Sequence, residues 1–181
     1  MTETSTLRMS FIDRLRADPA AAAALALFAI AIATILGAWY FEHVLKLAPC
    51  PLCLQQRLPY HIVIPLSLLM MLAALVRAPQ QLLTVGFIAI LVTVLCGAAL
   101  GIYHAGVEWH FWAGPTDCSG FITDFNNGGS ILGQIKTINL VRCDQAAWRF
   151  LGISLAGYNV LTSLAMAAIA SYGLLAPRSA A

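Results

Sequence analysis

The stretch LLTVGFIAILVTVLCGAALGIY, Leu82 to Tyr103, contains no charged residue and is almost continuously apolar. Three other runs share this character, from Ala20 to Phe41, from Leu58 to Val76 and from Phe150 to Ala176. Each reaches the roughly 18 to 20 apolar residues that cross a hydrocarbon core about 30 Å thick. A bilayer offers no water to unpaired backbone groups, and the runs lack strand-like alternation, so we expect helices. The sequence therefore predicts an all-α membrane protein, a four-transmembrane-helix bundle.

The composition of the whole chain agrees with this prediction. Its 181 residues are 60% hydrophobic and 10% charged, whereas a soluble domain carries about a quarter charged residues. The net charge of +2 includes no basic tract that would bind nucleic acid. We expect one membrane domain over residues 1–181, with approximate spans at 20–41, 58–76, 82–103 and 150–174. The first run is too long for the apolar region of a signal peptide and is expected to be an uncleaved anchor.

The charges indicate which side the loops face. With four spans, both termini and the short turn 77–81 (RAPQQ) share one side of the membrane, and the larger loops 42–57 and 104–149 share the other. Three arginines before the first span and one in the turn favour a cytoplasmic position for the first side, by the positive-inside rule. The larger loops are therefore predicted to face the periplasm or the exterior.

The cysteines follow the same division. Four of the five lie in the two larger loops, namely Cys50, Cys53, Cys118 and Cys143. On the periplasmic side they would meet the oxidising environment in which disulfides persist. The fifth, Cys96, lies in the middle of a span and is interpreted as a small buried apolar side chain.

The stretch APCPLCLQQR, residues 48–57, combines a C-x-x-C pair with an arginine at the mouth of the second span. Pro51 disfavours helical backbone at Cys50, so we expect extended chain there and a helix that starts near Cys53. In that helix Cys53 and Arg57 lie one turn apart on the same face. A helix N-terminus and a guanidinium would both favour a thiolate at Cys53. The alternatives are a static disulfide or half of a zinc site for the cysteines, and an interfacial anchor for Arg57.

Three stretches of the sequence resemble those of a known family. P-C-P-L-C-L-Q-Q-R is similar to the first redox loop of the DsbB family, the bacterial membrane enzymes that regenerate disulfides. The segment CDQAAWRFLGI, residues 143–153, resembles the family's cysteine followed by W-x-F-L-G. The stretch YHAGVEWHFWAGPTDC, residues 103–118, resembles a variant of the loop found in some members. The resemblance covers nearly the whole chain after the first fifteen residues.

The resemblance implies a quinone-dependent protein-disulfide oxidoreductase of the bacterial inner membrane, which links electron transport to protein folding as a redox chaperone. A periplasmic thioredoxin-like partner of the DsbA type would be oxidised by Cys118 and Cys143. Cys143 would then attack Cys50 and leave Cys53 as a thiolate in the charge-transfer role beside the quinone. Arg57 corresponds to the family's quinone-site arginine. The expected cofactor is ubiquinone or menaquinone, and no metal is expected.

Other polar residues near the loops have more than one interpretation. His61, just inside the second span, either hydrogen-bonds the quinone or is a satisfied interfacial histidine. Glu108 could relay protons to the quinone, but a solvated loop acid is the preferred interpretation. His104 and His110 fit an aromatic interfacial belt together with the tryptophans between and after them.

The segment 130–141 places Ile131, Ile135 and Ile138 at helical spacing. It predicts a short interfacial helix in the second periplasmic loop, and the alternative is an ordinary helix packed on the bundle.

Alternative functions stay open at this point. They are a paralogue dedicated to one thioredoxin-like protein, an enzyme resembling the vitamin K epoxide reductase group, and a non-catalytic membrane protein braced by disulfides. In the vitamin K epoxide reductase group the active C-x-x-C lies at the end of a later helix, whereas here the pair opens the second span. The sequence does not identify the quinone, the partner, the resting disulfide connectivity or the oligomeric state.

Overall fold

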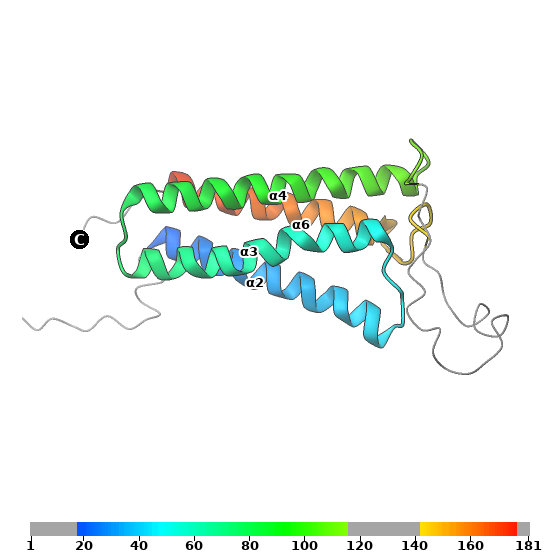
Figure 1. Ribbon diagram of the computed structural model, residues 1–181, viewed down its shortest axis with the longest axis horizontal. Helices are drawn as coiled ribbons and strands as arrows, with labels where there is room; N and C mark the ends of the chain where they lie inside the picture. Colours follow the sequence, from blue (N-terminus) through cyan, green and yellow to red (C-terminus); the bar gives the residue numbers. More distant parts are fainter. Residues whose placement is uncertain (1–17, 116–141, 177–181) are drawn as a thin grey trace, which may run out of the picture.

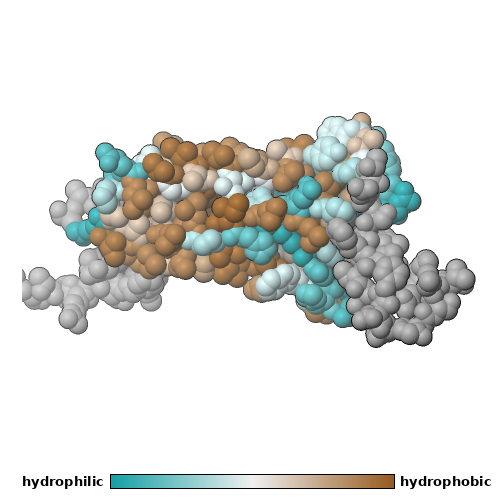
Figure 2. Space-filling model, in the orientation of Figure 1, coloured by the Kyte–Doolittle hydropathy of each residue, from teal (hydrophilic) through white to brown (hydrophobic). Residues whose placement is uncertain are grey.

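The structure is a computed structural model that describes residues 18–115 and 142–176. Within these ranges four long helices run side by side (Figure 1). They are α2 (Pro19–Trp39), which continues as the π-helix η1 (Tyr40–Val44), then α3 (Pro51–Leu75), α4 (Gln80–Glu108) and α6 (Leu155–Leu175). All four are long and apolar enough to cross a membrane. Apolar residues dominate the visible face, and hydrophilic residues gather towards its ends (Figure 2). The predicted four-helix bundle is confirmed.

Helices α3 and α4 extend well beyond their predicted spans at the end of the bundle that carries the cysteines. Helix α3 begins at Pro51, before the expected start at Cys53 and well before Leu58, and α4 runs to Glu108. Proline is well suited to the first helical position because no intrahelical hydrogen bond needs its missing N–H there. The preceding Cys50 is extended, with φ −75° and ψ 164°, as predicted. Most of the predicted first loop, 42–57, and the start of the second, at 104–108, are therefore helical.

The last span starts later than predicted because a hairpin precedes it. Strand β1 (Arg149–Phe150) pairs antiparallel with β2 (Ile153–Ser154). Between them Leu151 and Gly152 have φ of 49° and 81°, and a two-residue type I′ turn needs positive φ at both positions. Ser154 then caps α6, since its Oγ accepts a hydrogen bond from Gly157 N–H at 3.2 Å. The predicted interfacial helix at 130–141 lies outside the described residues.

The helices pack through large buried side chains and small residues at close approaches. The main core includes Leu27, Phe87 and Met166, all fully buried. A Cβ at Gly101 of α4 would lie only 2.8 Å from Val160 Cγ2 of α6, so this glycine lets the two helices approach closely. The prediction that Cys96 is buried was wrong, because its side chain is exposed on the outer surface of α4.

We expect Gly101→Ala to destabilise the bundle. The added Cβ would also lie 3.3 Å from the backbone nitrogen of Val160, and overpacking of this kind costs about 1–3 kcal/mol. Gly37→Ala is the matched control, because nothing lies within 4 Å of a Cβ at Gly37 and both changes gain the same helix propensity. In detergent, the thermal unfolding temperature of Gly101→Ala should be lower than that of Gly37→Ala. Equal unfolding temperatures would contradict this packing.

Candidate functional site

The polar and reactive side chains of the described residues converge at one end of the bundle. The start of α3, the end of α4, the π-helix η1 and residues 142–154 meet there, on the right-hand side of Figure 1. Chain segments distant in sequence therefore contribute to one site.

The C-x-x-C pair lies at the first turn of α3. The Sγ atoms of Cys50 and Cys53 are 2.7 Å apart, and Cys53 N–H donates a hydrogen bond to Cys50 Sγ at 3.2 Å. Both are free thiols; Cys50 is fully buried and Cys53 is partly exposed. A disulfide bond of about 2.05 Å would need only a small movement of either side chain.

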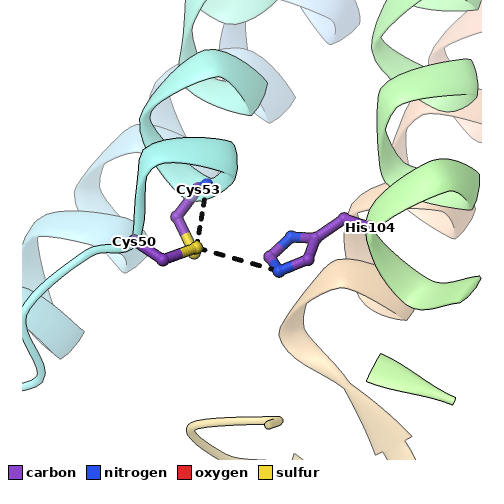
Figure 3. Close-up of side chains that lie close together, drawn as sticks. All are labelled: Cys50, Cys53 and His104. Atoms are coloured by element: carbon purple, nitrogen blue, oxygen red, sulfur yellow. Dashed lines mark hydrogen bonds between the residues drawn. The ribbon is translucent and has the colours of Figure 1, made fainter. Parts of the chain in front are cut away.

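A buried histidine faces this pair from α4. His104 Nε2 lies 3.8 Å from Cys50 Sγ (Figure 3). Its other ring nitrogen, Nδ1, is hydrogen-bonded to the side-chain amide of Gln56 at 2.5 Å. The assignment of His104 to an interfacial belt was wrong: α4 continues past Tyr103, and so carries His104 into the bundle, where it is 3% exposed. His110, by contrast, is exposed beyond the helix end.

Glu108 is also buried, one helical turn after His104. Its Oε1 lies 3.8 Å from His104 Nε2, and its Oε2 has no hydrogen-bond partner among the described residues. The interpretation as a solvated loop acid was therefore wrong. The same extension of α4 explains the error, because it turns a supposed loop residue into the last residue of a packed helix.

Arg57 forms an ion pair with Glu42 of η1, with Nη1 and Oε2 2.5 Å apart. Both side chains are largely buried, so each charge needs the other. The sequence alone did not identify Glu42 as the partner of Arg57. The available signal was that Glu42 directly follows the first uncharged run, just as Arg57 directly precedes the second.

The second loop reaches the C-x-x-C pair through Cys143. Cys143 is fully buried and packs in one cluster with Cys50, Leu52 and Val107. The segment that carries it is anchored by aromatic contacts, since the Trp148 ring lies 5.1 Å from Phe41 and stacks on Phe150 at 5.8 Å. The structure thus brings together three of the four cysteines singled out in the sequence. Cys118 lies outside the described residues.

A cavity of about 240 Å³ opens beside Cys53. Its apolar wall includes Ile35, Phe41, Leu47 and Leu155. Its polar lining includes Glu42, Gln56, Arg57, Tyr60, His104, Glu108 and Asn159. His61 is not part of this lining and is exposed on the outer surface of α3, so the geometry gives it no contact with a ligand in the cavity.

The two thiols have different surroundings. The hydrogen bond with Cys53 and burial raise the pKa of the Cys50 thiol. Cys53 lies beside the helix N-terminus with Arg57 one turn further on, and both favour negative charge. The charge of a reduced pair is therefore best placed on Cys53, on the side of the cavity.

The chain is similar to known proteins over most of its length. Residues 20–173 match the family profile described as "Disulfide bond formation protein DsbB". A protein of Rickettsia prowazekii (strain Madrid E), named "Uncharacterized protein RP370", is 32% identical over 86% of this chain and 88% of its own length. Two proteins named "Disulfide bond formation protein B" are also similar. The protein of Hahella chejuensis is 28% identical over 77% of this chain and 85% of its own length. The protein of Polaromonas sp. is 27% identical over 80% of this chain and 85% of its own length.

In the reduced protein we expect iodoacetamide to alkylate Cys53 before Cys50. Cys50 is fully buried, and a raised pKa keeps it as the less nucleophilic thiol at neutral pH. Mass spectrometry of peptides over a time course at pH 7 would measure both rates, with Cys96→Ser as a background that removes the exposed thiol. Faster alkylation of Cys50 would contradict the assigned difference between the two thiols.

Proposed function

The chain belongs to the DsbB family of membrane disulfide bond formation proteins, and on that premise we propose that it is a quinone-dependent thiol oxidase. Its partner is a periplasmic thioredoxin-fold protein of the DsbA type, which it returns to the disulfide form. The observation that carries the proposal is the burial of Cys143 against Cys50 while Cys53 lines a cavity. The C-x-x-C pair thus contacts the cysteine of the second loop and also borders a space for a small molecule.

The proposed cycle is a series of thiol–disulfide exchanges. A partner thiolate attacks Cys118 of a Cys118–Cys143 disulfide and releases Cys143. Cys143 then attacks Cys50 of the Cys50–Cys53 disulfide, joins it and releases Cys53. The partner's second thiol closes its own disulfide and frees Cys118, which retakes Cys143 and leaves Cys50 and Cys53 as a dithiol.

The second half of the cycle restores the Cys50–Cys53 disulfide. A bound quinone, ubiquinone or menaquinone, supplies the oxidising power by accepting the two electrons and two protons of the dithiol. Over the whole cycle the partner loses two electrons and two protons, and one quinol is formed. The electrons then leave through the respiratory chain of the membrane.

The lining of the cavity is suited to a bound quinone. Its aliphatic and aromatic wall suits a lipid-soluble ring, and Arg57 can donate hydrogen bonds to a carbonyl oxygen at the same wall as Cys53. His104 and Glu108 also line it, so two buried groups able to carry protons border the same cavity as Cys53.

We further propose that the cysteine-bearing end faces the periplasm and that the termini are cytoplasmic. The described bundle has one end with the C-x-x-C pair and Cys143, and thiol exchange with a secreted partner requires that this end lie in the oxidising compartment. The distribution of arginines around the first span supports the same orientation.

Quinone reduction by the purified protein tests the proposed function. With a reduced DsbA-type partner and ubiquinone-1, we expect Cys53→Ser and Cys118→Ser each to abolish turnover, because each breaks the exchange chain. Cys118→Ser should also remove the covalent complex with the partner, whereas Cys96→Ser should keep wild-type rates. Normal turnover in Cys53→Ser would refute the assignment of the quinone-facing thiol.

Arg57→Ala should raise the KM for quinone about tenfold or more and change the KM for the partner little. A hydrogen bond from a charged donor contributes about 1.5–3 kcal/mol, which corresponds to that range. Glu42→Gln keeps the arginine and removes its counter-charge, and Arg77→Ala, in the turn at the opposite end of the bundle, is the control. An effect of Arg57→Ala on partner KM alone would leave this arginine as an interfacial anchor.

A further inference from the structure

We propose that Cys50, Cys53 and His104 form a zinc site in the reduced protein, and that zinc held there blocks quinone reduction. The two Sγ atoms and one imidazole nitrogen lie within 4.8 Å of one another. Two cysteines and a histidine are a ligand set that zinc favours. In the sequence the C-x-x-C pair was only half of a zinc site, because nothing there indicated a third ligand. The structure supplies one from α4.

The distances are close to those of a tetrahedral site. With Zn–S bonds of about 2.3 Å and Zn–N bonds of about 2.0–2.1 Å, the ligand atoms are separated by about 3.6 Å for S and N and about 3.8 Å for the two sulfurs. His104 Nε2 and Cys50 Sγ are already 3.8 Å apart. The two sulfurs, at 2.7 Å, must separate by about 1 Å, and Cys53 has room for this because it borders the cavity.

The surroundings of His104 are those of a metal ligand. The amide nitrogen of Gln56 faces Nδ1. With this amide turned over, its Oε1 would accept a hydrogen bond from Nδ1–H and leave Nε2 unprotonated towards the sulfurs, as outer hydrogen-bond partners do for metal-binding histidines. Glu108 adds an independent indication of a cation. Its buried carboxylate lies 3.8 Å from the same Nε2, and its Oε2 has no partner among the described residues. Ser154 and Arg149 favour the charged form of this carboxyl group, and a bound cation would stabilise that form further. The cavity leaves a fourth position for water.

Zinc binding at this site depends on the redox state of the C-x-x-C pair. Zinc binds thiolates, so it can bind the dithiol but not the disulfide, and binding displaces the thiol protons without any transfer of electrons. Zinc bound to both sulfurs prevents them from closing the disulfide. The binding itself depends only on the geometry above, whereas the inhibition rests on the proposed function.

The binding test uses the full chain in detergent, free of quinone, with Cys118→Ser and Cys143→Ser to remove the second pair. Titration of Zn²⁺ against a chromophoric chelator should give one zinc per reduced protein and none after the Cys50–Cys53 disulfide is formed. Cd²⁺ should give the ultraviolet charge-transfer band of cadmium–thiolate bonds. Two-thiolate ligation without His104, or no stoichiometric binding by the reduced protein, would overturn the proposed site.

Histidine variants provide the matched comparison. His104→Gln should weaken zinc affinity at least tenfold, and Gln56→Leu should weaken it about tenfold through loss of the outer hydrogen bond. His110→Gln should have no effect, because His110 is exposed beyond the end of α4. Thermal unfolding of each variant checks that the bundle is intact. Equal affinity in His104→Gln and His110→Gln would refute the third ligand.

Inhibition is measured separately on the otherwise unchanged protein. Zn²⁺ should abolish quinone reduction reversibly, with recovery on addition of a chelator, and the zinc concentration needed should rise at least tenfold in Gln56→Leu. Binding without inhibition would refute the blocking role. A protein that reduces no quinone even without zinc would instead bear against the proposed function, and the binding titration would still decide the site.

Discussion

The start of α3 is fixed by Pro51, and the position of each reactive group at this end of the bundle depends on it. The proline disfavours helical backbone at the residue before it and is itself well suited to open a helix. Cys50 therefore stays extended as the N-cap, and Cys53 falls in the first turn with its N–H directed at Cys50 Sγ. A helix that began at Leu58 would have left Gln56 and Arg57 in a loop, where neither could reach its partner on a neighbouring helix.

Two polar contacts hold the neighbouring helices in register around that turn. Arg57 joins α3 to η1 through Glu42, and Gln56 joins α3 to α4 through His104. Buried polar groups are costly unless they are paired, and sliding α3 by a turn would break both contacts at once. The groups that are proposed to bind a quinone or a metal are thus the same groups that align the helices. Chemistry and packing are coupled at this end, whereas the other end of the bundle relies on apolar contacts and glycines.

Hydropathy was sufficient to predict the fold, since four uncharged runs of this length leave few alternatives to a helical bundle. It failed at the ends of the helices, because it treats polar residues such as His104 and Glu108 as loop. These residues are helical because partners from other segments satisfy or surround them, and such partners are not visible in a local window. The C-x-x-C pair and Arg57 could be singled out from their spacing alone. Glu42, Gln56 and the burial of Cys143 required the tertiary structure, which brings η1, α4 and residues 142–154 to the same turn.

The opposite orientation of the two thiols has a consequence for the proposed cycle. Cys50 is fully buried against Cys143, whereas Cys53 borders the cavity. The protein partner and the quinone therefore never need to occupy the same space, and electrons pass between them only through the C-x-x-C pair. Because Cys50 is fully buried, a small thiol in solution has no direct route to it. The second loop controls access to the pair, since Cys143 is the thiol packed against Cys50. Burial of one sulfur thus confines the exchange to the loop that carries the partner's electrons.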